Sequence, residues 1–542
     1  MANRRNRGGS SGKGDGTWIA DRFMRGVAAH RAGRLGDAEA DYSAVLSRMP
    51  DHPGALLWLG VVMLRRGSHA RAIGLLSKAA RVDPSNASAH GHLGIALRES
   101  GRNDEALACL DRALALRGAY PEALVNRGIV LRGLGRLDEA IATLERAIAL
   151  NDAMPEAWTS MANALRDRQE PGQALASYDH ALALQPQSVA AHVGRGGALN
   201  DLRRFEEALA AFDAALTQAP DLVEAHFNRA NMLRNLGRAA EAIEGYDRTL
   251  RLRPDHADAM SNRGSALLDL CRFDDALAAF EQTRRIDPSH VDAHRNEAIC
   301  RLTRGDFARG FELFEWRWRN PALGKAWRGP DRPQWAGERV DGTLLVWGEQ
   351  GIGDQLLYLG LVRDLLPFAR RVVLAVEPRL TALVARSFPG VDVIPLDAAS
   401  AMTDCAAHVP MGSLGRYLRS SATAFERSSS AAYLVPDRTR LAMLRDRLAA
   451  SGKRTCAISW FSGSERFGRF KSLPFHCLHP LLAVEGLRFV DLQYRKAGDV
   501  DAEMRPDEPG NDGSFPLERF PDIDAWADLE HEQFVRGSDW AS

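Results

Sequence analysis

The sequence repeats itself every 34 residues through its first half, and this period constrains the fold more than any other feature. When units start at residues 19, 53, 87, 121, 155, 189, 223 and 257, position 8 is always Gly or Ala and position 20 is always Ala. Position 24 is large, as in Tyr42, Leu76 and Phe212, and position 32 is Pro in six units. A chain with this pattern is expected to build one small structural unit many times over.

The repeated positions predict pairs of short helices. Two helices cross closely only where small residues meet, which positions 8 and 20 provide, and we expect the large residue at position 24 to fill the gap toward the next unit. Proline at position 32 ends the second helix, because it lacks an N–H and disfavours helix in the residue before it. This 34-residue pattern resembles the tetratricopeptide repeat.

The resemblance covers residues 18–324, as eight units and a degenerate ninth that starts at residue 291. It implies an α-solenoid with a concave groove that binds an extended segment of a protein or peptide partner. Position 6 is expected to face this groove and resembles the asparagine ladder of O-GlcNAc transferases, because an Asn amide can pair with a peptide backbone as donor and acceptor. The groove candidates are Asn126, Asn228, Asn262 and Asn296.

Two alternatives stay open for the polar residues of this predicted groove. The asparagines are also compatible with ordinary solvated positions on a helix, and other residue types interrupt the ladder at position 6. The arginines at position 12 either make the groove cationic or are solvated. They are Arg98, Arg132, Arg166 and Arg234.

A tryptophan-rich stretch follows the repeats. Residues 311–337, together with Trp347, hold five of the eleven tryptophans, with Arg and Pro interleaved. We interpret 325–342 as a domain joint, because Trp buries a large area and tolerates a polar edge. An RNA-stacking platform is the alternative, but Lys+Arg and Asp+Glu both total 70, and nucleic-acid binding needs a basic surplus.

Beyond residue 340, short apolar runs alternate with helical patterns, which predicts a parallel α/β sheet. The expected strands of a first set are 343–347, 370–377, 391–396 and 406–411. A second set has strands at 454–460 and 487–493. The predicted domains are therefore 343–450 and 451–496, followed by an acidic irregular tail over 497–542. A Gly/Ser-rich stretch over 1–17 is expected to be a disordered tail.

The first expected strand runs into the glycine-dense loop GEQGIGD, residues 348–354. Its glycine spacing matches neither a dinucleotide fingerprint nor a P-loop. Asp354 lies where the next helix begins, and the helix dipole stabilises a carboxylate there. The local sequence alone therefore explains Asp354 without any catalytic role.

A second resemblance changes that interpretation. The span FELFEWRW…PQWAGE…GTLLVWGEQGIGD is similar to the joint in bacterial repeat proteins that end in a heptosyltransferase-like glycosyltransferase domain. That domain has two Rossmann-like halves (the GT-B fold) with the active site between them. The resemblance implies that Asp354 is the general base that takes a proton from the acceptor hydroxyl.

Residues 458–494 resemble the start of the half that binds the nucleotide-sugar. The resemblance implies that Lys471 contacts the donor phosphates, where a cation stabilises the leaving group. The other implied donor-binding residues are Gly351, Gly353, Ser462 and Gly463. Further strands of this half are not recognisable in 497–542, so we expect the second Rossmann-like half to be incomplete and the domain truncated.

Two functions are therefore expected. The first is a protein-binding repeat scaffold that carries a truncated glycosyltransferase-like domain. The alternative is an active glycosyltransferase that moves a sugar from a nucleotide-sugar onto a protein or glycan acceptor selected by the repeats. No cofactor or metal ion is expected for either, since the nucleotide-sugar would be a co-substrate.

The remaining composition favours a cytoplasmic protein, and the heptosyltransferase-like resemblance implies a bacterial one. The six cysteines form no CxxC pair, which argues against a zinc site or a disulfide framework. No apolar run approaches the roughly 20 residues that a membrane helix needs. We therefore expect no membrane span and no nucleic-acid partner.

Overall fold

The computed structural model describes residues 11–320, 329–349, 351–426, 433–449, 454–458, 487–491 and 517–519. The chain divides into two compact units, Met1–Cys300 and Arg301–Ser542. The division falls earlier than the predicted end of the repeats at residue 324. The reason is that α18 (Phe307–Phe314), the short second helix of the ninth repeat, packs against α23 (Leu414–Leu418) of the second unit.

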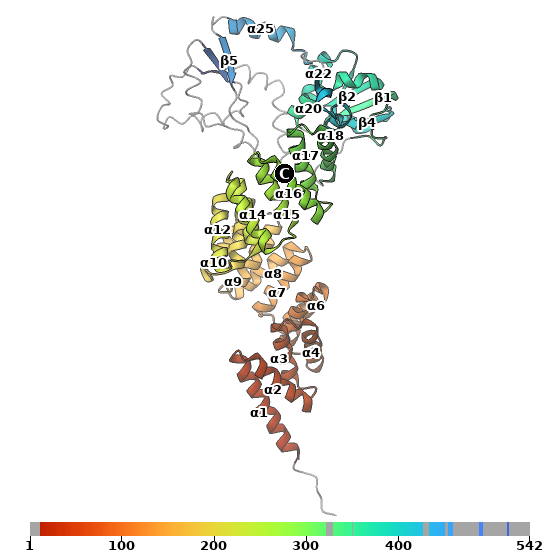
Figure 1. Cartoon of the computed structure of the whole chain (residues 1–542). Helices are drawn as coiled ribbons and strands as arrows, with labels where there is room; N and C mark the ends of the chain where they lie inside the picture. Colours follow the sequence, from red (N-terminus) through yellow and green to blue (C-terminus); the bar gives the residue numbers. More distant parts are fainter. Residues whose placement is uncertain are drawn as a thin grey trace, which may run out of the picture. The chain divides into compact units, whose positions relative to one another are not determined.

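Each of the eight 34-residue units forms one helical hairpin (Figure 1). The two helices of a hairpin pack against each other, and the second packs against the first helix of the next hairpin. The helices of the first four hairpins are α1 (Ser11–Arg31), α2 (Leu35–Arg48), α3 (Pro53–Arg65), α4 (His69–Val82), α5 (Ala87–Glu99), α6 (Asn103–Leu116), α7 (Pro121–Gly133) and α8 (Leu137–Leu150). Those of the next four are α9 (Pro155–Asp167), α10 (Pro171–Leu184), α11 (Val189–Asp201), α12 (Phe205–Gln218), α13 (Val223–Asn235), α14 (Ala239–Leu252), α15 (Ala257–Asp269) and α16 (Phe273–Ile286), and the ninth unit starts with α17 (Val291–Thr303).

The repeated small and large residues form the core of each hairpin. All eight alanines at position 20 are completely buried, and the side chains at position 24 are 0–1% exposed. A Cβ added to Gly128 at position 8 would lie 2.5 Å from Cγ of Leu144 at position 24 of the same repeat. The expectation that position 24 fills the gap toward the next unit is therefore incomplete, because this side chain lies directly over position 8 of its own hairpin.

The turn inside every hairpin uses a backbone conformation that the sequence pattern did not reveal. Position 15 has a positive φ in all nine repeats. This conformation closes the first helix, because the backbone N–H at position 16 of the repeat then donates to the carbonyl at position 11, as Arg34 does to Ala29. Six repeats have glycine at position 15, which adopts this conformation without strain. The other three have Gln169, Arg203 and Cys271, with φ between 57° and 66°.

The ends of the array differ from the predicted boundaries. α1 begins at Ser11, inside the stretch predicted to be a disordered tail. Trp18 packs against the hydrophobic core and lies under the guanidinium of Arg48, 3.8 Å from the ring centroid, so the helix is anchored near its start. The second helix ends two residues before position 32 in all eight repeats, including those with Gly118 and Asp152 there, so proline is compatible with this end but not required for it.

The second unit contains a four-stranded parallel sheet with the order β3-β2-β1-β4. The strands are β1 (Val340–Trp347), β2 (Ala369–Val376), β3 (Asp392–Pro395) and β4 (Ala407–Pro410). The parallel sheet and its four strands were predicted. The joint ends at residue 339 rather than 342, because Val340 already pairs with Ala369 of β2.

Helices cover both faces of this sheet, as the continuous apolar strands require. Leu344, Val346 and Leu374 point toward a core closed by α20 (Ile352–Leu359), α21 (Val362–Leu365), α22 (Thr381–Ser387) and α23. Leu345, Trp347 and Val373 point the other way, toward η4 (Leu396–Ala401) and Trp318 of η1 (Glu315–Arg319). The smaller elements are η2 (Leu366–Phe368), η3 (Pro378–Leu380), η5 (Met411–Ser413), α24 (Ala422–Glu426) and α25 (Arg438–Ala449).

The tryptophans of the joint are part of this core. Trp335 is fully buried against Phe368 and Tyr417, and its Nε1 donates to the carbonyl of Glu338. Trp347 is also fully buried and donates to Nδ1 of His408 over 3.1 Å. Buried rings cannot stack on bases, so these two residues do not form the RNA platform considered above.

A second parallel sheet has the order β5-β6-β7. Its strands are β5 (Arg454–Ile458), β6 (Leu487–Asp491) and β7 (Leu517–Arg519). The first two were predicted. β7 lies in the 497–542 stretch predicted to be irregular, and that prediction is wrong at this point because Leu517 pairs with Phe489 of β6. A strand of three residues is too short to give a recognisable alternation.

The turn at position 15 gives a direct test of the repeat geometry. We expect Cys271→Gly to raise the free energy of unfolding by about 0.5–1 kcal/mol, because positive φ costs an L residue roughly 1–2 kcal/mol and the flexibility of unfolded glycine offsets part of the gain. Gly135→Ala, at the same position of another repeat, should lower it by about 1 kcal/mol. Urea unfolding followed by circular dichroism measures both, and equal shifts in one direction would contradict this account of the turn.

Candidate functional site

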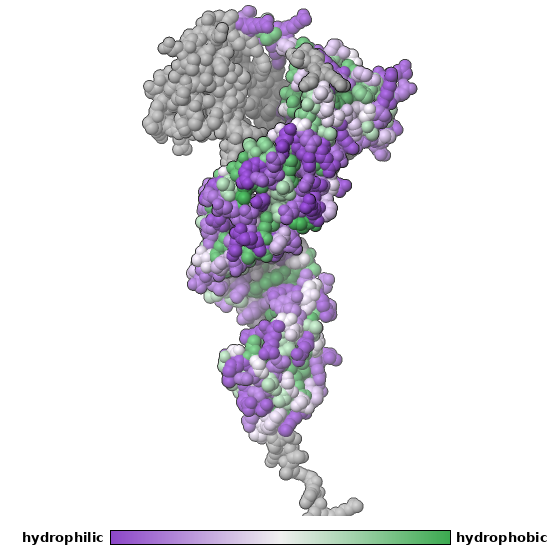
Figure 2. Space-filling view, viewed as in Figure 1, coloured by the Kyte–Doolittle hydropathy of each residue, from purple (hydrophilic) through white to green (hydrophobic). Residues whose placement is uncertain are grey.

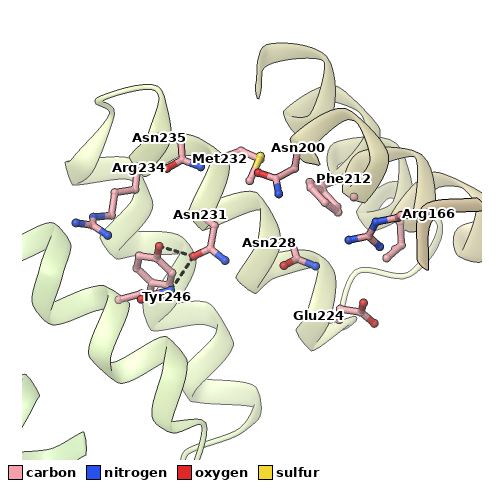
Figure 3. Close-up of a pocket in the computed structure, with 13 residues that line it drawn as sticks. Arg166, Asn200, Phe212, Glu224, Asn228, Asn231, Met232, Arg234, Asn235 and Tyr246 are labelled. Carbon is pink, nitrogen blue, oxygen red and sulfur yellow. Dashed lines mark hydrogen bonds between the residues drawn. The ribbon is translucent and has the colours of Figure 1, made fainter. Parts of the chain in front are cut away.

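A pocket of about 530 Å³ opens in the repeat array between α9 and α15 (Figure 3). Its lining is mainly polar, with a few apolar side chains such as Phe212 and Met232. The predicted groove residues Asn228 and Asn262 both line it, whereas Asn126 and Asn296 do not. The lining residues are Arg166, Val193, Gly197, Asn200, Phe212, Glu224, Asn228, Asn231, Met232, Arg234, Asn235, Tyr246 and Asn262.

The arginines at position 12 are mostly paired with the following repeat. Nε of Arg132 donates to Asp167 over 2.6 Å, and Nε of Arg166 donates to Asp201 over the same distance. Nε of Arg234 donates to Asp269 over 2.7 Å. Each acceptor is at position 13 of the next repeat. These arginines therefore neither make the predicted groove cationic nor remain simply solvated, because a carboxylate balances each of them.

The fourth arginine at position 12, Arg98, lacks such a carboxylate, since Gly133 stands at position 13 of the following repeat. Its guanidinium donates to Oδ1 of Asn126, whose Nδ2 donates to the carbonyl of Glu122. Both ends of the Asn126 amide are therefore engaged within the array.

Two other groove asparagines also bond to the repeat before them. Nδ2 of Asn262 donates to Oδ1 of Asn231 over 3.0 Å, and Nδ2 of Asn296 donates to Oγ of Ser265 over 2.9 Å. Asn231 also accepts from the hydroxyl of Tyr246, and burial raises the pKa of that phenol. Position 6 thus forms a polar link to position 9 of the preceding repeat.

The link fails between the sixth and seventh repeats. Position 9 of the sixth repeat is Gly197, so Asn228 has no side chain to bond there. Positions 12 and 13, which hold an Arg–Asp pair at three other interfaces, are here Asn200 and Asn235. Within the described residues, the amides of Asn200, Asn228 and Asn235 have no hydrogen-bond partner. Figure 3 places these three amides around the same pocket.

Arg166 provides the main charged group at this pocket. A Cβ on Gly197 would lie 2.7 Å from its guanidinium carbon, so the glycine leaves the space that the side chain occupies. Burial lowers the pKa of Arg166, but the hydrogen bond and charge of Asp201 outweigh burial and raise it overall. Arg166 therefore stays a cation and can donate its remaining N–H groups into the pocket, as its orientation in Figure 3 indicates.

The second candidate site is the loop between β1 and α20. Asp354 lies in the first turn of α20 with its side chain exposed and no partner among the described residues. Gly351 is the N-cap, and nothing lies within 4 Å of a Cβ built on Gly353. Gly348 has a packing role instead, because its missing Cβ leaves room for the buried Gln355, whose Oε1 accepts from the backbone N–H of Glu377.

A buried ionic network lies beside this loop. The Arg317 guanidinium of η1 donates to both oxygens of Glu349, at 2.9 and 3.0 Å, to Oγ of Ser413 at 2.8 Å and to Glu315 at 2.7 Å. The side chains of Arg317 and Glu349 are each 3% exposed. Glu349 follows β1 and Ser413 follows β4, so the arginine fastens η1 to the carboxyl ends of these two strands.

The electrostatics of this network depend on Arg317. Burial raises the pKa of Glu349, while the charge and hydrogen bonds of Arg317 oppose the rise. Burial also raises the pKa of the nearby Tyr358 to about 12. Two carboxylates, Glu315 and Glu349, share one guanidinium here, so removing the guanidinium would leave buried charge without compensation.

Three residues implied by the glycosyltransferase resemblance, Ser462, Gly463 and Lys471, lie outside the described residues. The structure therefore brings Asp354, Gly351 and Gly353 together but does not test the donor-binding set. Among the residues that are described, no group of three or more His, Cys, Asp or Glu side chains is placed to hold a metal ion, and the prediction of a metal-free site stays a prediction.

The fold and the comparisons agree on the class of the first unit, which is a helical-repeat solenoid. Family models described as tetratricopeptide repeat match residues 23–87, 92–155, 159–223 and 221–289. The roughly 300 N-terminal residues are therefore an array of tetratricopeptide repeats, a class of scaffold that indicates peptide or protein partners.

Individual relatives match only parts of the chain. Protein FlbA of Caulobacter vibrioides is 30% identical over 225 residues, which cover 38% of this chain and 36% of FlbA, so the chain spans about a third of that relative. Among solved structures, MamA is 26% identical with a TM-score of 0.29, covering 32% of this chain and 94% of MamA. PilF of Pseudomonas aeruginosa is 22% identical with a TM-score of 0.34, covering 37% of this chain and 92% of its own.

The described part of the chain contains no helix that combines the length and apolar character needed to span a bilayer. On the face of the repeats seen in Figure 2, hydrophilic residues lie interspersed with hydrophobic ones.

Sequence reasoning missed several residues of both sites. Asn200 and Asn235 were overlooked, although aligning positions 12 and 13 shows two amides here where three other interfaces have an Arg–Asp pair. Arg317, Glu349 and Ser413 carry no such signal, because residues 317 and 413 meet only through the tertiary fold.

The buried network generates a stability prediction. Arg317→Met should lower the free energy of unfolding of the second unit by roughly 3–5 kcal/mol, because Glu349 would be left charged and unpaired. Adding Glu349→Gln should restore part of that loss by removing the charge. Urea unfolding followed by tryptophan fluorescence measures both variants.

The control for this prediction is Arg371→Met, which breaks the exposed pair with Asp392 and should cost less than about 1 kcal/mol. A double variant that is no more stable than Arg317→Met alone would contradict the ionic account.

Proposed function

We propose that this protein is a scaffold whose tetratricopeptide repeats bind an extended peptide segment of a partner protein. The observation that carries the proposal is the pocket between α9 and α15, whose lining includes the amides of Asn200, Asn228 and Asn235, without hydrogen-bond partners among the described residues. A primary amide donates and accepts at once, which is what a peptide backbone offers in return.

The direct test is to select short random peptides displayed on phage against the full chain. Recovered peptides should bind in solution by fluorescence anisotropy with Kd values in about the micromolar range. In hydrogen–deuterium exchange they should protect the backbone of α9, α11, α13 and α15, which supply most of the pocket lining. Failure to recover any binding peptide, or protection confined to the second unit, would refute the proposal.

A second candidate function concerns the α/β unit, for which we propose a glycosyltransferase-like domain. The strand order β3-β2-β1-β4, all parallel, is the order found in one half of a Rossmann-like fold. The exposed carboxylate of Asp354 follows β1 directly, where a general base would meet an acceptor hydroxyl. In the proposed reaction the acceptor oxygen bonds to the sugar carbon, the bond from that carbon to the nucleotide phosphate breaks, and Asp354 takes the hydroxyl proton.

Nucleotide-sugar binding and transfer would test this second candidate. UDP-, GDP- and ADP-sugars should be screened by thermal shift on the full chain, and a stabilising donor used in a transfer assay. Asp354→Ala should keep donor binding and lose at least about 100-fold in rate, the usual contribution of a general base. Asp404→Ala, an exposed carboxylate of the same unit, is the control. Full activity of Asp354→Ala would refute the base, and no shift with any donor would refute the candidate.

A further inference from the structure

Two rows of ion pairs join successive repeats over part of the array, and only one of them is present between repeats six and seven. The first row joins Arg at position 12 to Asp at position 13 of the next repeat. It is present from repeat four to repeat six and from seven to eight, and Asn200 and Asn235 take its place between repeats six and seven. The second row joins Arg at position 7 to Asp at position 25 of the preceding repeat. It continues across the same interface, where Nε of Arg229 donates to Asp213 over 2.5 Å.

The packing of this interface is also intact. Leu199, Ala225 and Ala230 are completely buried, as their equivalents are in other repeats. A poorly formed junction would lose apolar packing and both rows of ion pairs together. Here only the groove-side polar links are missing, which are the Arg–Asp pair and the bond from position 6 to position 9. The polar links are therefore missing at an interface where α12 still packs against α13.

The missing links leave three amides at one place. Asn200 comes from α11, while Asn228 and Asn235 come from α13 and are two helical turns apart. In other repeats the equivalent groups bond to their neighbours, as Asn262 and Asn296 do. Behind the amides lie the buried side chains of Phe212 and Met232, which exclude water from one wall of the pocket.

The charges around the pocket decide which peptide fits. Arg166 and Arg234 are balanced by Asp201 and Asp269, and the remaining ionised lining residue, Glu224, is exposed without a partner among the described residues. The net charge of the groups around the pocket is therefore not positive. A phosphate or a strongly acidic segment would find no uncompensated cation, whereas uncharged backbone and side-chain amides would find donors and acceptors.

We infer that the array binds its peptide at the interface between repeats six and seven, and that the bound segment is extended and uncharged. Asn200, Asn228 and Asn235 pair with its backbone or neutral polar side chains, and Arg166 donates to one of its carbonyls. This inference rests on the proposed function and adds the place and the chemical class of the ligand. The other asparagines predicted for the groove serve to join the repeats.

The experiment adds the missing Arg–Asp link at this interface and, in a second variant, removes such a link at another interface. Asn200→Arg with Asn235→Asp rebuilds the Arg–Asp link at the pocket, and should raise the thermal midpoint by about 1–2 °C while weakening a phage-selected peptide at least about 10-fold. The reciprocal variant, Arg132→Asn with Asp167→Asn, removes an existing link between repeats four and five. It should lower the midpoint slightly and leave the Kd of the same peptide within about 2-fold.

Asn228→Ala keeps the test independent of any folding defect, because this side chain makes no bond within the described residues. It should weaken the peptide at least about 5-fold with an unchanged thermal midpoint, as expected for the loss of a hydrogen bond to the ligand. If Asn126→Ala and Asn296→Ala weaken binding as much, peptide binding stands but its assignment to this interface is overturned. If no peptide binds the unmodified chain, the proposed function itself fails.

Salt dependence tests the chemical class. The Kd should change less than about 3-fold between about 50 and about 500 mM NaCl, because no ion pair forms with the ligand. A fall in affinity of more than about 10-fold over that range, or selection of peptides rich in acidic residues, would overturn the assignment of an uncharged segment.

Discussion

The repeat array depends on one contact, that between the large side chain at position 24 and the small residue at position 8 of the same hairpin. A Cβ on Gly196 would lie 2.7 Å from the ring of Phe212, so the second helix can approach this closely only because the first carries no side chain there. The contact sets how the two helices cross. Since it recurs every 34 residues, each hairpin has nearly the same geometry, and equivalent positions of successive repeats fall next to one another.

This regularity makes the polar links between repeats possible. Position 12 meets position 13 of the next repeat, and position 6 meets position 9 of the preceding one, wherever the side chains allow it. Each exposed ion pair contributes little by itself, about 0.2–1 kcal/mol. The links matter more because they occupy hydrogen-bonding groups, and a bonded amide or guanidinium is less available to a ligand. A break in the links therefore leaves polar side chains unbonded while α12 still packs against α13.

The second unit depends on a different kind of interaction. In its parallel sheet the strand order reverses between β1 and β4, because β2 and β3 lie on one side of β1 and β4 lies on the other. The carboxyl ends of the strands at such a reversal are where ligands bind in open parallel sheets. Here Arg317 bonds to Glu349 and Ser413 at these strand ends. A buried ion pair adds less stability than its Coulomb energy suggests, but breaking it is costly. The network thus fixes η1 at the sheet edge and leaves Asp354 as the exposed acidic group of the adjacent helix.

The sequence by itself determined the helical hairpins and the first parallel sheet, because periodic small, large and apolar residues act through local geometry. Ala38 and its seven equivalents were predicted to be in the core and are there, and the strands near 343–347 and 370–377 were placed within a few residues. β7 escaped prediction, since three residues carry no period. Only the tertiary structure decided that Asn126, Asn262 and Asn296 bond within the array whereas Asn228 does not, and that Arg317 meets Glu349. The physical reason is that a polar side chain is satisfied by whatever the fold places beside it, and residues 32 or 96 positions away leave no mark on the local pattern.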